Sequence, residues 1–327
     1  MKLNVNKIIF IMLMMLSTIL SMNSTMWIGI WMGMEINMMT FIPLISKLKD
    51  KKSSKAIMIY FLTQSIGSMI MLFFILLPKL YLYPINETLK TLIMISLLIK
   101  MGAAPFHFWF PNMMKNLMWD EAMMLMTWQK IVPIYLLGLL NPNNFLFVSI
   151  ILSSIIGGIG GLNYTSLLKI MAYSSINHLS WILLMIKHQI QWLKYFIMYS
   201  MIVMMLTYLF YYNNFYYFNQ IYMNSNSIIE SLMLSSLMLS LGGLPPFLGF
   251  LPKWIVIQSL IEFNMMFLMM IMLLTSMLTL FYYMRLISAL LLTYTSVNKY
   301  MFKSSMLKGN YIILIINCML PIYSIMF

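Results

Sequence analysis

Long apolar runs recur along the whole chain, and they limit its possible folds more than any other feature. Each run is about 20 residues long, which is enough for an α-helix to cross the ~30 Å hydrocarbon core of a bilayer. Because lipid offers no water to backbone N–H and C=O groups, a spanning segment must satisfy them within a helix or a closed barrel. The length of the runs favours helices, so we predict an all-α, polytopic membrane protein.

The runs predict about 11 transmembrane helices when one interrupted segment is counted as a single crossing. They cover residues 1–24, 25–46, 56–77, 89–109, 122–140, 145–162, 167–186, 192–212, 228–263, 265–292 and 311–327. No cleavage pattern of small residues follows the first run, so we expect it to remain as a helix. No long linker divides the runs, and we expect one transmembrane domain over residues 1–327.

The composition agrees with a membrane protein and disfavours several other classes. The chain is 62% hydrophobic and only 8% charged, against about 25% charged residues in a typical soluble domain. Its net charge of +13 comes from lysines that gather in loops on one side of the alternating crossings. We therefore expect anionic lipid head groups, and no nucleic acid, as partners of these lysines. The single cysteine, Cys318, excludes a disulfide within the chain and a thiolate cage for a metal.

Five ionisable side chains lie at similar depth on separate runs, away from the loops that would carry charge. They are Glu35, Lys100, Lys130, His178 and Lys253. A charged side chain near the middle of a membrane helix costs roughly 2.5–3.5 kcal/mol on insertion scales. Such residues are functional candidates, and we predict that these five form a row across the membrane plane.

Structural explanations stay open for some of these residues. A membrane lysine can extend its ammonium group to the head groups, and this alternative applies most to Lys253. His178 lies among serines and asparagine, so it can bridge helices by hydrogen bonds without carrying protons. Arg285 lies toward the basic end of its run, and we interpret it as an interfacial anchor. Glu35 is hard to explain without a partner, because a lone carboxylate is costly in hydrocarbon.

Prolines and glycines interrupt the runs beside the lysines. Pro105 removes a backbone donor, so the helix expected over residues 89–109 should kink or break close to Lys100. Pro133 clashes with the carbonyl of the residue that precedes Lys130. Residues 242–252, directly before Lys253, contain too many glycines and prolines for a straight helix. Broken membrane helices are tolerated where they are packed in protein or line water, so we expect discontinuous helices around a site.

A buried lysine beside a broken helix is suited to proton transfer. Desolvation weakens the hold of an amine on its proton, and a neighbouring carboxylate strengthens it. A Glu35–Lys100 pair would therefore act as a switch, since separating the two groups would send the proton onward. The imidazole of His178 can accept and release a proton near neutral pH.

Four motifs contain these residues or lie beside them. They are residues 100–109 (KMGAAPFHFW), 125–133 (LMTWQKIVP), 169–181 (KIMAYSSINHLSW) and 242–254 (GGLPPFLGFLPKW). In this combination and order they resemble the antiporter-like membrane-arm subunits of mitochondrial NADH–ubiquinone oxidoreductase, respiratory complex I. The composition is similar to that of the insect versions.

The resemblance implies an antiporter-like fold in the mitochondrial inner membrane and proton translocation driven by electron transfer from NADH to ubiquinone. It implies a translocase subunit with no redox chemistry or cofactor of its own, because FMN, iron–sulfur clusters and ubiquinone are expected in other subunits. Neighbouring antiporter-like chains and lipids, including cardiolipin, are the implied partners.

The resemblance also implies roles for single residues. Glu35 would pair with Lys100, Lys130 would be the central proton carrier, and Lys253 would be the distal carrier. A cation/proton antiporter subunit is the alternative function, because it would use the same broken helices and buried lysines.

Overall fold

The computed structural model describes residues 5–46, 50–81, 87–140, 143–224, 228–295 and 317. The elements in this part of the chain are the helices α1 (Val5–Asn23), α2 (Trp27–Ile45), α3 (Lys51–Tyr81), α4 (Glu87–Met101), α5 (Trp109–Met114), α6 (Trp119–Met126), α7 (Trp128–Leu139), α8 (Phe145–Gly160), α9 (Leu167–Lys187), α10 (Trp192–Tyr212), α11 (Phe218–Asn224), α12 (Ile228–Gly242), α13 (Phe250–Glu262) and α14 (Met266–Thr295). The predicted all-α class is therefore confirmed. The run predicted over 311–327 lies outside the described residues, apart from Asn317.

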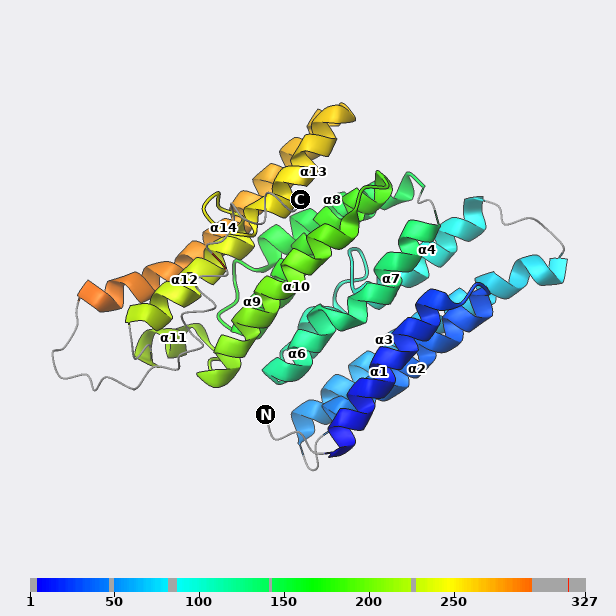
Figure 1. Cartoon of the computed structure of the whole chain (residues 1–327), viewed down its shortest axis with the longest axis horizontal. Helices are drawn as coiled ribbons and strands as arrows, with labels where there is room; N and C mark the ends of the chain where they lie inside the picture. Colours follow the sequence, from blue (N-terminus) through cyan, green and yellow to red (C-terminus); the bar gives the residue numbers. More distant parts are fainter. Residues whose placement is uncertain are drawn as a thin grey trace. The chain divides into compact units, whose positions relative to one another are not determined.

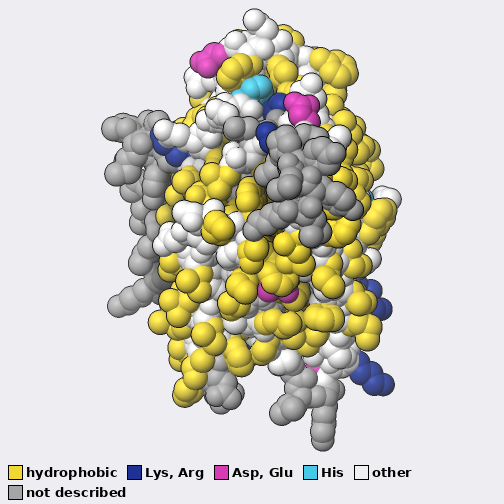
Figure 2. Space-filling model, turned by 90° about the vertical axis from the view of Figure 1, so that its right-hand side faces the viewer, with side chains coloured by type: hydrophobic (Ala, Val, Ile, Leu, Met, Phe, Trp, Pro, Cys, Tyr) yellow, Lys and Arg dark blue, Asp and Glu magenta, His cyan; other side chains and the backbone are white. Residues whose placement is uncertain are grey.

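Many of these helices have the length and composition of membrane spans. Five described stretches are long and apolar enough to cross a bilayer: Trp27–Ile45, Lys51–Pro78, Trp119–Leu139, Trp192–Tyr212 and Met266–Ser288. Large apolar side chains such as Met58, Phe73 and Phe267 are more than half exposed. Hydrophobic side chains also cover most of the described surface in Figure 2. The chain is a multi-pass membrane protein, and its total of about 11 crossings stays a prediction.

The chain divides into two compact units, Met1–Ser149 with Ile186–Gln189, and Ile150–Met185 with Ile190–Phe327. In the first unit, α2 packs against α1 and α3, and α4 packs against α3 and α7. Figure 1 shows α1, α2 and α3 side by side. In the second unit, α12 and α13 each pack against α10 and α14. The single transmembrane domain expected over residues 1–327 stays a prediction.

The helix that carries Lys100 ends earlier than the sequence suggested. The predicted run continued to about Trp109, but α4 ends at Met101 and the chain is irregular until α5 begins. Gly102 follows with φ of 71°, a left-handed conformation that costs a side-chain-bearing residue more than it costs glycine. The predicted break beside Lys100 is therefore present, and Gly102 ends the helix before Pro105 is reached.

The run predicted as one helix over 122–140 is two helices in the structure. α6 ends at Met126 and α7 begins at Trp128, with Thr127 between them at φ −110° and ψ −75°. The Thr127 hydroxyl donates to the carbonyl oxygen of Met123 at 2.8 Å, a local bond of the kind that often bends helices. The interruption thus precedes Lys130, and Pro133 lies within α7.

Candidate functional site

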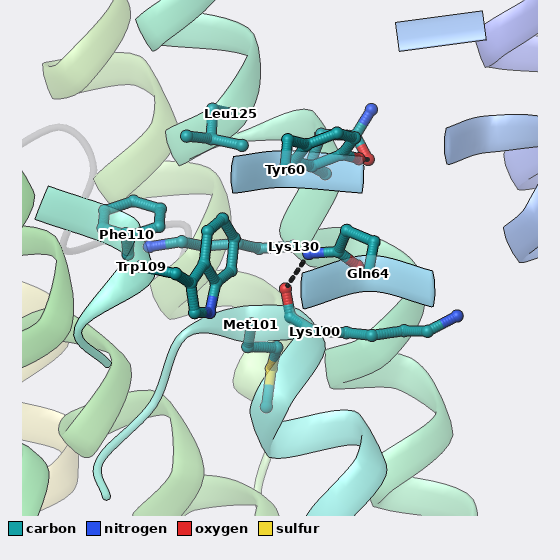
Figure 3. Close-up of a pocket in the computed structure, with 9 residues that line it drawn as sticks. Tyr60, Gln64, Lys100, Met101, Trp109, Phe110, Leu125 and Lys130 are labelled. Atoms are coloured by element: carbon teal, nitrogen blue, oxygen red, sulfur yellow. Dashed lines mark hydrogen bonds between the residues drawn. The ribbon is translucent and has the colours of Figure 1, made fainter. Parts of the chain in front are cut away.

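A cavity in the first unit lies beside the end of α4. Its lining comes from α3 to α7 and consists of Tyr60, Gln64, Lys100, Met101, Trp109, Phe110, Leu125, Gln129 and Lys130. The space inside it accommodates about one water molecule. Figure 3 shows that the side chains of Lys100 and Lys130 extend in opposite directions from this region. Two of the predicted site residues therefore line one polar cavity.

Lys100 is buried in the last turn of α4, whereas the sequence predicted it near the middle of a longer helix. Its ammonium group is 3.8 Å from the sulfur of Met34 on α2, and its carbonyl oxygen accepts a bond of 3.1 Å from the amide of Gln64. Glu35 follows Met34 and interacts electrostatically with Lys100. Its Oε1 atom has no hydrogen-bond partner among the described residues, and no ion pair joins it to Lys100 there. The structure thus places the two groups in one region without bonding them.

Lys130 is buried on α7, close to the start of that helix. Its Nζ atom lies 4.7 Å from the centre of the Phe110 ring, the geometry of a cation–π contact. Nζ has no hydrogen-bond partner among the described residues. Because a buried ammonium group without an acceptor is costly, the adjoining cavity is where water can complete its bonding.

A chain of neutral polar side chains links three helices beside the cavity. The Tyr60 hydroxyl on α3 donates to Oε1 of Gln129 on α7 at 3.2 Å. The Gln129 amide nitrogen donates to Oδ1 of Asn37 on α2 at 3.1 Å, and it lies 3.3 Å from the sulfur of Met14. Sequence reasoning missed these residues because a single tyrosine, glutamine or asparagine in an apolar run does not indicate its partner.

The second unit contains a helix end of the same form. α12 ends at Gly242, and Gly243 follows with φ of 77°. The Gly243 N–H donates to the carbonyl of Ser240 at 3.0 Å, and the Leu244 N–H reaches back to Leu239 at 3.3 Å. This pair of bonds is the Schellman ending of an α-helix. The interruption predicted for this segment is therefore present.

Lys253 binds directly to this helix end. It is buried in the first turns of α13, and its ammonium group donates to the carbonyl oxygen of Gly242 at 2.8 Å. The ring of Trp181 lies 5.9 Å from the same Nζ atom. A cation at the carboxyl end of a helix is favoured by the helix dipole. The ammonium group is thus held at the break by a backbone carbonyl. The structural alternative predicts instead that it extends to the lipid head groups.

His178 is buried on α9 and contacts two tyrosines of α10. Its Nδ1 atom is 2.9 Å from the Tyr195 hydroxyl oxygen, and its ring centre is 4.9 Å from that of Tyr199. This bonding agrees with both interpretations of His178, as a proton carrier and as a bridge between helices.

Arg285 on α14 has a specific structural contact. Its Nη1 and Nη2 atoms donate to the carbonyl oxygens of Leu162 and Tyr164, at 2.6 and 3.0 Å. The guanidinium group therefore holds the segment that follows α8.

The five predicted site residues are divided between the two units. Glu35, Lys100 and Lys130 belong to the first, and His178 and Lys253 belong to the second. A row through all five stays a prediction. Among the described residues, no group of three or more His, Cys, Asp or Glu side chains could hold a metal ion.

The fold and these sites define a class of protein: a multi-pass helical membrane protein whose interrupted helices carry buried lysines, as in ion-translocating subunits. The family model described as "NADH:quinone oxidoreductase/Mrp antiporter, TM" matches residues 24–279. NADH-ubiquinone oxidoreductase chain 2 of Anopheles gambiae is 44% identical over 310 residues, which are 91% of this chain and 89% of that protein. The chain 2 protein of Aedes aegypti is 42% identical, over 93% and 91% of the two chains. The chain belongs to the NADH-ubiquinone oxidoreductase chain 2 family.

A solved structure shares the fold. A chain in respiratory complex I from Thermus thermophilus, solved with bound aureothin, matches with a TM-score of 0.79 at 18% identity. The match covers 96% of this chain and 76% of that chain. The predicted antiporter-like fold is therefore confirmed.

Proposed function

We propose that the chain is a membrane-arm subunit of NADH:ubiquinone oxidoreductase that translocates protons while other subunits carry electrons from NADH to ubiquinone. The observation that carries this proposal is the burial of Lys100, Lys130 and Lys253 beside interrupted helices in a member of this family. The chain would contribute no redox cofactor, and FMN, iron–sulfur clusters and ubiquinone would be held by its partner subunits.

The site residues would act as successive proton carriers. Lys100 and Lys130 would exchange protons through water in the cavity that both line. A nearby Glu35 carboxylate would favour the charged form of Lys100. When the two groups move apart, Lys100 would release its proton. Lys253 would carry protons in the second unit, with His178 as a candidate intermediate. Moving one charge across the membrane potential costs ~2.3 kcal/mol per 100 mV, so the energy must come from electron transfer in other subunits.

The proposed location is the mitochondrial inner membrane, with other complex I subunits and anionic lipids, including cardiolipin, as partners. Exposed lysines at the start of α3, namely Lys51, Lys52 and Lys55, support the lipid contact. Basic residues near a bilayer surface gain about 1 kcal/mol each from anionic head groups.

Lys100→Met and Glu35→Gln variants of the assembled enzyme test this function. We expect coupled turnover to fall by roughly tenfold in each, because each variant removes a proton-handling group, while the amount of assembled complex is retained. The control is Lys115→Met, since Lys115 is exposed after α5. Normal turnover and a normal proton-to-electron ratio in assembled Lys100→Met enzyme would contradict the proposed role.

A cation/proton antiporter subunit is the second candidate function, because the matching family model also describes Mrp antiporter chains. Purification of the native assembly separates the two candidates. Recovery of the chain in a large complex that oxidises NADH supports the first. Recovery in a smaller assembly that exchanges Na⁺ for H⁺ without NADH oxidation supports the second.

A further inference from the structure

We propose that Tyr60 is a further proton-transfer residue, which connects the region of Glu35 and Lys100 with the cavity at Lys130. Gln129 would be the positioning residue that holds the Tyr60 hydroxyl. This inference rests on the proposed function and assigns it a route within the first unit.

Tyr60 is placed at the cavity that the two lysines share. Its side chain is buried on α3 and lines the same cavity as Lys100 and Lys130 (Figure 3). It also interacts electrostatically with Glu35. Tyr60 therefore shares one cavity with both lysines, whose side chains extend apart, so water would connect the three groups.

The polar side chains of the cavity lining differ in their ability to relay a proton. Apart from the two lysines, the polar side chains of this lining are Tyr60, two glutamines and the indole of Trp109. An indole only donates, and a carboxamide does not readily exchange a proton in a relay. A phenolic hydroxyl both donates and accepts, so it can pass a proton on and remain neutral. Among the described lining residues, Tyr60 is thus the neutral group suited to a relay.

The bonds of Gln129 fix how the hydroxyl is oriented. The amide nitrogen of Gln129 donates to Oδ1 of Asn37, so the amide oxygen is the end that faces Tyr60. A carboxamide oxygen only accepts, and therefore Tyr60 is the donor in the 3.2 Å bond. This arrangement leaves the lone pairs of the Tyr60 oxygen available to a proton donor in the cavity. Gln129 holds the relay in a resting orientation and does not itself carry the proton.

The transfer step conserves atoms and charge. The hydroxyl first rotates about its C–O bond, from Gln129 toward a water molecule in the cavity. An N–H bond of the Lys100 ammonium group then breaks, and its proton passes through water to form a new O–H bond with the Tyr60 oxygen. The original O–H bond of Tyr60 breaks as its proton passes to the cavity water and from there to the neutral amine of Lys130. The tyrosine is neutral before and after the step. The hydroxyl then returns to Gln129.

Tyr60→Phe in the assembled enzyme, reconstituted into liposomes, tests the relay. We expect coupled turnover to fall by roughly tenfold, and the solvent isotope effect in D₂O to increase because proton transfer becomes slower. Tyr135→Phe is the matched control, since Tyr135 lies on α7 and does not line the cavity. Wild-type turnover and isotope effect in Tyr60→Phe, beside a defective Lys100→Met, would overturn the relay and leave the proposed function intact. Wild-type behaviour of both variants would overturn the proposed function as well.

Gln129→Met provides the second test. It tests the role of Tyr60 even if the Tyr60→Phe enzyme does not assemble. Methionine has a similar volume but removes the acceptor of the Tyr60 hydroxyl. We expect a smaller loss of turnover together with an altered isotope effect, which a merely structural bond between helices would not change. The double variant should be no slower than Tyr60→Phe alone, because both changes act on one step. An unaltered isotope effect in Gln129→Met, or losses that multiply in the double variant, would overturn the proposal.

Discussion

The helix breaks after α4 and after α12 are built alike, yet they treat the neighbouring lysines differently. In both, a glycine with positive φ directly follows the last helical residue, and the chain resumes as a helix after an irregular segment. The two segments share glycine, proline, phenylalanine and proline at the same spacing: Gly102, Pro105, Phe106 and Pro111, and Gly243, Pro246, Phe247 and Pro252. One local sequence pattern thus produces the break in each unit.

The difference lies in what binds the last carbonyl groups of each helix. After α12, the carbonyl oxygen of Gly242 accepts a bond from the Lys253 ammonium group. After α4, the indole of Trp109 donates to Ile99 at 3.0 Å, and the amide of Gln64 donates to Lys100. Neutral side chains therefore occupy these carbonyls in the first unit, and the ammonium groups there are left to the cavity and its surroundings. Lys253, in contrast, uses one of its three N–H groups to bind a carbonyl at the helix end.

The largest effect on turnover is expected for Lys253→Arg. The guanidinium group keeps donors for the Gly242 carbonyl, but arginine does not release a proton in proteins. We expect coupled turnover to fall by roughly tenfold or more, with assembly and thermal stability close to wild type. Turnover per assembled complex is the measurement. Normal turnover would mean that Lys253 acts only as a cap of α12.

Gly243→Ala and Gly102→Ala compare the two breaks directly, and we expect an intermediate effect. A Cβ atom at Gly243 would lie 2.7 Å from Cδ and 3.0 Å from Nζ of Lys253, whereas one at Gly102 would lie 3.0 Å from Cβ of Phe110. Both variants should lose about 1–2 kcal/mol of local stability, because left-handed backbone is unfavourable for alanine. Only Gly243→Ala should also displace a lysine and reduce turnover several-fold. Thermal unfolding and turnover are measured in both variants. Equal losses of turnover would contradict the claim that only the break after α12 positions a lysine.

The smallest effect on turnover is expected for Gln64→Leu. This variant removes the amide that binds the Lys100 carbonyl, and leaving a buried carbonyl unpaired costs about 1–3 kcal/mol. We expect a lower thermal unfolding temperature with a modest change in turnover, because no proton carrier is lost. Unchanged stability would indicate that this carbonyl does not depend on Gln64.

The sequence predicted the features that depend on local chemistry and missed those that depend on packing. Apolar length predicted the membrane helices, and proline and glycine predicted the breaks beside Lys100 and Lys253. The end of α4 was misplaced because the break was attributed to Pro105, although Gly102 already ends the helix. Helix ends are set by such local backbone bonds, and apolar length does not indicate them.

The contacts of Tyr60 and Gln64 depend on how α3 is rotated against α4 and α7. Apolar residues surround most of a membrane helix, so hydrophobic periodicity does not define that rotation. One signal was present: the two residues are four positions apart in an apolar run and therefore share one face of a helix. That face was identifiable from the sequence, but its partners were not.

The ratio of protons translocated to electrons transferred in assembled Lys130→Met enzyme tests the central claim most directly. Lys130 is buried beside the cavity, and its ammonium group contacts the Phe110 ring but has no hydrogen-bond partner among the described residues. We predict a lower proton-to-electron ratio or strongly reduced turnover in Lys130→Met. The Lys115→Met control should keep the wild-type ratio and the wild-type turnover. A wild-type ratio at wild-type turnover in Lys130→Met would contradict the claim that buried lysines of this chain carry protons.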